Sequence, residues 1–115
     1  MTLQQKLERI GTALVAGVGN NVYHYWRPNM AAPFCVWAED GEAFESFNGD
    51  NRKGEQAVSG YVDYYTKTEY DSTLDTIQDV LLSISGDIPF AWRLDSVQYE
   101  DDTNLIHYQW VWGVA

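Results

Sequence analysis

The sequence predicts an α+β domain in which two helices cover one face of an antiparallel β-sheet. Two segments carry apolar residues at the spacing of an amphipathic helix, and several others alternate apolar and polar residues with the period of a strand. Their expected order is α-β-β-β-α-β-β. The length of 115 residues fits one domain over 1–115, large enough to bury a core without disulfides or metals.

The first helix is expected near the start of the chain. Its apolar stripe, at spacings of four, three and four residues, is Leu3, Leu7, Ile10 and Leu14. Thr2 is the expected N-cap, and Gly17 or Gly19 is the expected stop. Such a stripe is unstable when exposed, so this helix must pack on the sheet or on another helix.

The middle of the chain is expected to supply three or four strands. The first is "VYHYWRP", closed by Pro28, and the segment "FCVWAEDGEAFESF" is expected to form two more around a turn at Asp40-Gly41. A polar loop, "NGDNRKGE", precedes the strand "QAVSGYVDYYTK". Gly60 inside that strand indicates a bulge or a close backbone contact.

The last third of the chain predicts a second helix and a β-hairpin. The helix "STLDTIQDVLLSI" is expected to begin with Ser72 and Asp75 in a capping box and to stop at Gly86. The hairpin joins "AWRLDSVQYE" to "LIHYQWVWG" through the turn "DDTN". The expected core of the domain is Leu7, Ile10, Leu14, Val22, Val36, Val62, Leu74, Ile77, Leu81, Ile84, Leu94, Ile106 and Trp110.

The chain is strongly acidic. Seven Lys and Arg against 17 Asp and Glu give a formal net charge of −10 and a pI near 4.3. Binding to nucleic acid or to an anionic membrane depends on Lys and Arg side chains that neutralise phosphates, so the negative net charge opposes both kinds of binding. The single cysteine, Cys35, excludes an intrachain disulfide, and no apolar signal or spanning segment is seen, so we expect the protein to be made in a cytoplasm.

The sequence predicts no catalytic residue, no cofactor and no metal site. Cys35 could pair with His24 or His107, but its apolar flanks favour a buried structural thiol. The histidines and the cysteine lack the paired spacing of a zinc site, and "GVGNN" lacks the lysine of a phosphate loop. The carboxylates cluster at expected turns, where solvated charge is the ordinary outcome.

The aromatic residues carry more information. Five Trp and eight Tyr exceed what one small core can enclose on one face of a sheet. Tyr and Trp combine a large apolar area with a polar tip, which suits protein interfaces. We therefore expect part of this aromatic surface to contact a partner.

The chain resembles the small tail-completion proteins of long-tailed bacteriophages, and most closely the tail terminators, also called head–tail joining or minor tail proteins. The resemblance rests on the N-terminal helix, "VYHYWRP", the acidic hairpin, "GYVDYYTKTEYDSTLDTIQDVL" and "WRLDSVQYEDDTNLIHYQWVWGV". In that class a "VDYYTK"-like strand leads into a helix, and an acidic turn precedes an "HY-W" closing strand. The likeness spans nearly the whole chain.

The resemblance implies a structural, non-enzymatic protein of the virion, located in the tail at the head–tail junction. Tail terminators look like α+β domains that close into a homohexameric ring. The ring sits on the tail-tube protein, stops tube growth and presents a surface to the head–tail connector protein, while DNA passes through without specific binding. A negative lumen would repel phosphates and let the genome slide.

We expect the closing strand and "VYHYWRP" to pair with neighbouring copies at their edges. The acidic tips at Asp40 and Asp101 and the loop from Gly49 to Gly54 are expected to contact the tube or the connector. The hypothetical interface residues are Tyr23, Tyr25, Trp26, Asp40, Asp50, Arg52, Lys53, Asp101, Tyr108, Trp110 and Trp112.

Two alternatives stay open. The first is a small-molecule-binding or enzymatic α+β domain whose aromatic residues line a pocket. The second is another phage adaptor, such as a head-completion protein or an acidic mimic of DNA. DNA mimicry needs carboxylates spaced like phosphates along a surface, whereas here they cluster at turns.

Overall fold

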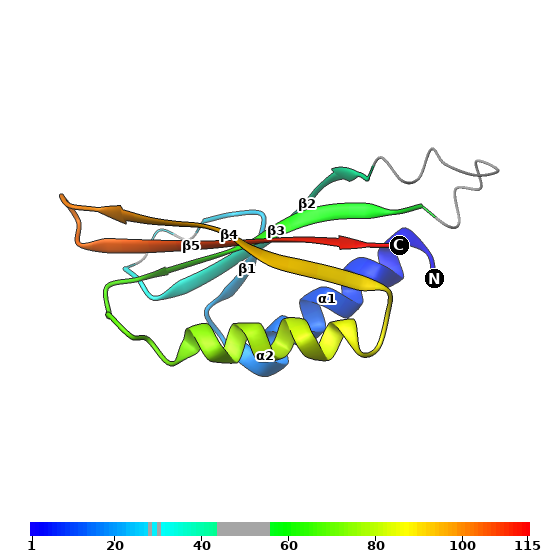
Figure 1. Ribbon diagram of the computed structural model, residues 1–115, viewed down its shortest axis with the longest axis horizontal. Helices are drawn as coiled ribbons and strands as arrows, with labels where there is room; N and C mark the ends of the chain where they lie inside the picture. Colours follow the sequence, from blue (N-terminus) through cyan, green and yellow to red (C-terminus); the bar gives the residue numbers. More distant parts are fainter. Residues whose placement is uncertain (28, 30, 44–55) are drawn as a thin grey trace.

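The structure is a computed structural model that describes residues 1–27, 29, 31–43 and 56–115 (Figure 1). The elements are α1 (Leu3–Val18), β1 (Val22–His24), β2 (Phe34–Glu42), β3 (Val58–Thr66), α2 (Thr73–Ser85), β4 (Phe90–Glu100) and β5 (Leu105–Val114). This order confirms the predicted α+β class and the predicted succession of elements. Neither helix in this described part of the chain is long and apolar enough to cross a membrane.

The strands form one sheet in the order β1-β2-β3-β5-β4. Three pairs are antiparallel, but β1 and β2 are parallel, with Val22 beside Cys35. The prediction of a wholly antiparallel sheet is therefore wrong at this pair. The chain after His24 returns to the end of the sheet where β1 began, and the Cys35 amide donates to the Asn21 carbonyl at 2.8 Å.

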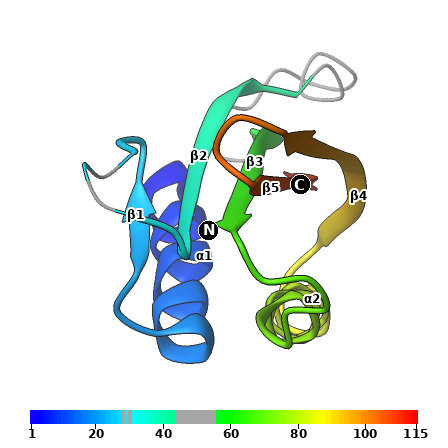
Figure 2. The same ribbon diagram turned by 90° about the vertical axis from the view of Figure 1, so that its left-hand side faces the viewer.

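Both helices lie on the same face of the sheet, as predicted (Figure 2). α1 lies under β1 and β2, whereas α2 lies under the opposite side of the sheet (Figure 2). The first and last residues lie at one end of the long axis, and the tip of the β4–β5 hairpin lies at the other (Figure 1). The molecule is elongated, with principal extents of 49 × 25 × 23 Å.

The expected turn at Asp40-Gly41 is wrong, because β2 continues through it to Glu42. The pairing of β2 with β3 shifts between Glu39 and Gly41, which leaves Asp40 in a β-bulge. The Ser59 hydroxyl donates to Asp40 Oδ1 at 2.8 Å, so the partner strand holds this position extended. The second half of the expected hairpin falls within 44–55, outside the described residues.

The first helix begins as predicted, with a capping box. The Gln5 amide donates to the Thr2 hydroxyl at 3.2 Å, and the Thr2 amide donates to Gln5 Oε1 at 2.8 Å. The helix ends before Gly19, whose φ of 112° favours glycine. Both predicted ends of α1 are therefore close to the observed ones.

The second helix is capped by a different residue from the one predicted. Ser72 makes no side-chain capping bond, whereas Asp71 Oδ1 accepts a hydrogen bond from the Thr73 amide at 2.9 Å. Asp71 Oδ2 accepts from the hydroxyls of Tyr64 and Thr66, both at 2.7 Å. One carboxylate thus caps α2 and ties it to the end of β3, which is why the cap moved one residue.

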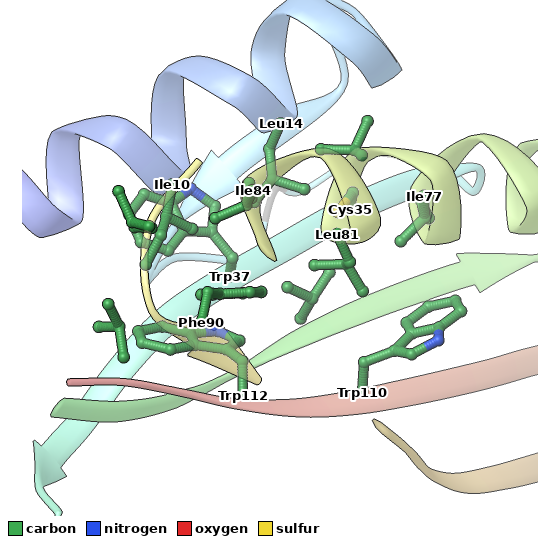
Figure 3. Close-up of a cluster of buried hydrophobic side chains, with 14 of the residues drawn as sticks. Ile10, Leu14, Cys35, Trp37, Ile77, Leu81, Ile84, Phe90, Trp110 and Trp112 are labelled. Atoms are coloured by element: carbon green, nitrogen blue, oxygen red, sulfur yellow. The ribbon is translucent and has the colours of Figure 1, made fainter. Parts of the chain in front are cut away.

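The core lies between the helices and the sheet (Figure 3). The largest fully buried side chains on this side are Trp110, Ile10, Leu14, Ile77, Leu81, Val62, Val114, Thr66 and Cys35, while Phe34 is buried on the other face against Tyr65. Close packing depends on Gly60, because a Cβ there would collide with the Ala38 carbonyl and the Trp112 indole. This confirms the predicted close backbone contact. Leu94 was assigned to the core wrongly, since 44% of it is exposed.

Candidate functional site

The β4–β5 hairpin extends beyond the helices toward one end of the molecule (Figure 1). Its strands have 11 and 10 residues, and the predicted turn at 101–104 joins them. The Tyr99 hydroxyl donates to Asn104 Oδ1 at 3.0 Å, and Asn104 adopts the left-handed φ of 54° that asparagine tolerates. The tip is therefore an ordered turn that carries the acidic residues Asp101 and Asp102.

Three apolar side chains of β4 are exposed, and we call them the β4 edge patch: Leu94, Val97 and Tyr99. They are 44%, 52% and 59% exposed. A bulge between Leu94 and Ser96 lets Leu94 and Val97 face the same side although they are three residues apart. Leu94 lies opposite Trp110 of the core, so the patch is on the helix-covered side, at the margin of the sheet.

The β4 edge patch lies beside an open backbone edge. β4 is the last strand of the sheet on its side, so its outer backbone groups are open to another strand. Arg93 and Asp95 flank Leu94 along the strand and form an exposed ion pair at 2.8 Å. Arg93 lies opposite Val111, so it belongs to the face of the sheet away from the helices and not to the border of the patch.

A second exposed aromatic surface follows β1, at the other edge of the sheet. Trp26 is 75% exposed and packs its edge against the Tyr25 ring, with 5.5 Å between centroids. Tyr25 stacks on His24 at 3.8 Å, and His24 stacks on Trp37 at 3.9 Å. This stack holds Trp26 outward from a buried base.

The backbone of Tyr25 is strained, with a φ of 74° that bulky residues rarely adopt. Glu39 holds it in place by accepting hydrogen bonds from the Tyr25 hydroxyl and from His24 Nε2, the latter at 2.8 Å. Burial alone would raise the pKa of Glu39, but these hydrogen bonds, together with a backbone hydrogen bond and the charge of His24, lower the pKa below its ordinary value. The hydrogen bond to Glu39 raises the pKa of Tyr25, so its phenol stays protonated and donates.

The face of the sheet away from the helices carries a polar and aromatic cluster. Asp63 Oδ1 lies 2.9 Å from His107 Nε2 and accepts from Gln109 Nε2 at 3.0 Å. The His107 ring stacks on Tyr65 at 4.2 Å, and the Arg27 guanidinium covers Tyr65 at 4.7 Å. These contacts join β3 to β5 and anchor the chain that follows β1.

The thiol that could have completed a catalytic pair with a histidine is enclosed in the core. Cys35 is fully buried, and burial, followed by the charge of Asp63, raises its pKa to about 12. A thiol with that pKa is almost entirely protonated at neutral pH and is a poor nucleophile. The geometry fits the structural reading of Cys35.

A wide, shallow hollow of about 370 Å³ lies over small residues of β3, β4 and β5. Ser59, Gly113 and Ala91 form one row across these strands, and Asp40 and Arg93 also line the hollow. Within residues 1–27, 29, 31–43 and 56–115, no group of three or more metal-ligating side chains was found.

The predicted interface residues differ in how far they are exposed. Tyr25, Trp26, Asp40 and Asp101 are exposed, and Tyr23 and Tyr108 are half-buried. Trp110 and Trp112 are only 1% and 3% exposed, so the prediction that they contact a partner is wrong: the helices cover their side of the sheet. The predicted interface residues that lie outside the described part of the chain are Asp50, Arg52, Lys53 and the loop from Gly49 to Gly54.

The structure brings Tyr25 and Trp26 together but places Asp40 and Asp101 toward opposite ends of the sheet. The expected free edge of the closing strand is also wrong, since β5 lies between β3 and β4. Sequence reasoning missed Val97 and Tyr99. The break in alternation at Asp95 was the signal that could have revealed them, because it marks the bulge.

No family model matches the chain, and no curated protein matches it at a significant level.

Proposed function

We propose that this chain is a structural virion protein of a long-tailed phage that assembles into a ring, ends the tail tube and joins it to the head connector. The observation that carries the proposal is the β4 edge patch on the extended hairpin. A strand that exposes both its backbone edge and three apolar side chains is built to be covered by another chain.

The position of a second exposed surface supports a ring rather than a simple dimer. The β4 edge patch and the Trp26 surface belong to opposite edges of the sheet and differ in composition. Contacts between two different surfaces of identical copies join head to tail, and they close into a ring when the rotation allows.

The charge of the chain fits a ring around DNA. Six copies would carry 6 × (−10) = −60 formal charges. A negative lumen would keep phosphates from adhering and let the genome pass. Assembly must then depend on apolar area and local ion pairs that overcome repulsion between the copies.

The test is the substitution Val97→Lys, with Val15→Lys as a matched control. Val15 lies on α1 and is 51% exposed, nearly the same as Val97 at 52%. We expect wild type and Val15→Lys to sediment as rings or to cap tubes of the phage's tail-tube protein, and Val97→Lys to remain monomeric with an unchanged melting temperature. The readouts are sedimentation velocity and tube length in electron micrographs.

Two results would contradict the proposal. One is a wild-type chain that stays monomeric and leaves the length of growing tubes unchanged. The other is a Val97→Lys variant that assembles and caps as well as wild type. Either result would favour the alternative that the aromatic surfaces belong to a ligand-binding domain.

A further inference from the structure

We infer that β4 of one copy pairs antiparallel with β1 of the next, so that one β-sheet continues from subunit to subunit around the ring. The inference rests on the proposed function, because it names the contact that would close the ring. In this pairing, Val97 of one copy lies beside Val22 of the next.

The topology supplies two different edges for this contact. β1 and β4 end the sheet order, and in the described part of the chain no strand lies beyond either of them. They lie on opposite sides of the molecule (Figure 2). β1 runs parallel to β2 and β5, and β4 runs antiparallel to β5, so β4 and β1 have opposite directions. A rotation about an axis along the strands therefore brings two antiparallel edges together.

The register places the two edges at the same height. One row of paired residues crosses the sheet through Val22, Cys35, Tyr64, Tyr108 and Val97. The next row on the same face passes through His24, Trp37, Val62, Trp110 and Leu94. The three residues of β1 are thus level with the segment of β4 that carries the exposed Leu94 and Val97. Two copies related by that rotation would therefore pair at these rows with no shift along the strand direction.

The side chains match across such a junction. Val22 and Val97 share the row through Cys35 and Tyr108 and face the helix-covered side, where they would shelter each other. Tyr23 would meet Ser96 on the opposite face, since these residues also share a row. Trp26, two residues beyond β1, supplies additional exposed apolar area beside the β1 edge.

The charged groups of two neighbouring copies would be complementary at the hairpin end of the sheet. Arg27 lies over Phe34 and Tyr65, at the end of the sheet toward which the hairpin tip extends. The hairpin tip of the adjacent copy would bring Glu100, Asp101 and Asp102 toward the same end. Attraction between these groups offsets part of the repulsion between two chains of charge −10.

Cysteine cross-linking tests the register directly. We would prepare Val22→Cys, Val97→Cys and the double variant, and treat each with a short bismaleimide under conditions in which wild type forms rings. The native Cys35 is fully buried and unreactive in the folded chain. On a denaturing gel, the double variant should give a ladder of cross-linked oligomers up to the size of the closed ring. The two single variants should cross-link at least tenfold more when mixed than when treated separately.

The control pairs Val22→Cys with Leu82→Cys, because Leu82 is 58% exposed but lies on α2. This pair should give no ladder. Cross-linking of Val97→Cys alone would overturn the inference by showing a two-fold β4–β4 contact. Rings that form without any Val22–Val97 cross-link would also overturn it, while leaving the proposed function intact. A chain that caps no tubes but still gives the ladder would reject the function and keep the contact.

Discussion

At the scale of single residues, the glycine in the middle of β3 decides how the core is built. The Trp112 indole lies across Gly60, and the Ala38 carbonyl approaches it from the neighbouring strand. No side chain fits between the two groups. The Trp112 indole can therefore lie over the sheet under the helices, where it is only 3% exposed.

We predict that Gly60→Ala destabilises the fold by roughly 2 kcal/mol, since the added methyl group forces the sheet and the indole apart. Gly86→Ala is the matched control, because its added Cβ would lie 3.6 Å from the nearest atom and its φ of −77° suits alanine. Urea unfolding monitored by tryptophan fluorescence gives both values. Equal stabilities for the two variants would show that the sheet relaxes around Gly60.

The residue pattern predicted some of this and missed the rest for a physical reason. The sequence predicts either a bulge or a close backbone contact at Gly60, and the structure shows the close contact. The prediction that Trp110 and Trp112 belong to the partner surface is wrong, because alternation shows which residues share a face but not which face the helices cover. Only the packed structure shows that the helices take that face.

At the scale of elements, the start of α2 depends on one carboxylate. Asp71 accepts from Tyr64, Thr66 and the Thr73 amide. Burial raises the pKa of Asp71, but the bonds from Tyr64, Thr66 and Thr73 outweigh it, and the net pKa is lowered. Burial, followed by the bond to Asp71, raises the pKa of Tyr64 to about 12. The pair is therefore a charged acceptor and a neutral donor at every physiological pH.

We predict that Asp71→Ala lowers the free energy of unfolding by about 2 kcal/mol at pH 7, through the lost cap and the lost charged hydrogen bonds. Because the folded pKa of Asp71 is depressed, its contribution is present above the unfolded-state value near 4 and is lost as the pH falls through the folded value. The difference in the free energy of unfolding between wild type and Asp71→Ala should therefore become smaller in acid. Denaturant unfolding at pH 7 and pH 3 measures it, with Ser72→Ala as the control. A gap that is the same at both pH values would disprove this role.

The order of the elements and the turn at 101–104 were predictable, whereas the course of β2 through Asp40 and the pairing of β1 were not. Helical stripes and strand alternation gave the correct order, because each reflects a local periodicity. The turn signal at Asp40-Gly41 failed because pairing with β3 outweighs a local preference for turning. The parallel pairing of β1 could not be predicted, since it depends on where a loop returns.

At the scale of the whole molecule, the net charge would oppose the proposed assembly, while the two strand edges would favour it. Each copy carries −10, and neighbouring copies in the proposed ring would lie within a few Debye lengths of each other. Salt weakens the repulsion between charges at these distances, but it does not weaken the stabilisation gained by burying the β4 edge patch.

We predict that the assembled fraction rises at least severalfold between 20 mM and 500 mM sodium chloride, about the range over which the Debye length falls from roughly 20 Å to 4 Å. Analytical ultracentrifugation at fixed protein concentration measures this fraction. Glycerol at matched viscosity is the control for a nonionic effect. Assembly that falls with added salt would show that ion pairs such as those of Arg27, and not apolar area, dominate the contact.

The location of both chain ends has a practical corollary. The N-terminus and the C-terminus lie at the end of the long axis away from the hairpin tip (Figure 1). In a ring built with its axis along the strands, any tag fused to either terminus would emerge on a single rim and leave the opposite rim bare. Gold-labelled particles would then reveal which rim is oriented toward the tail and which toward the capsid.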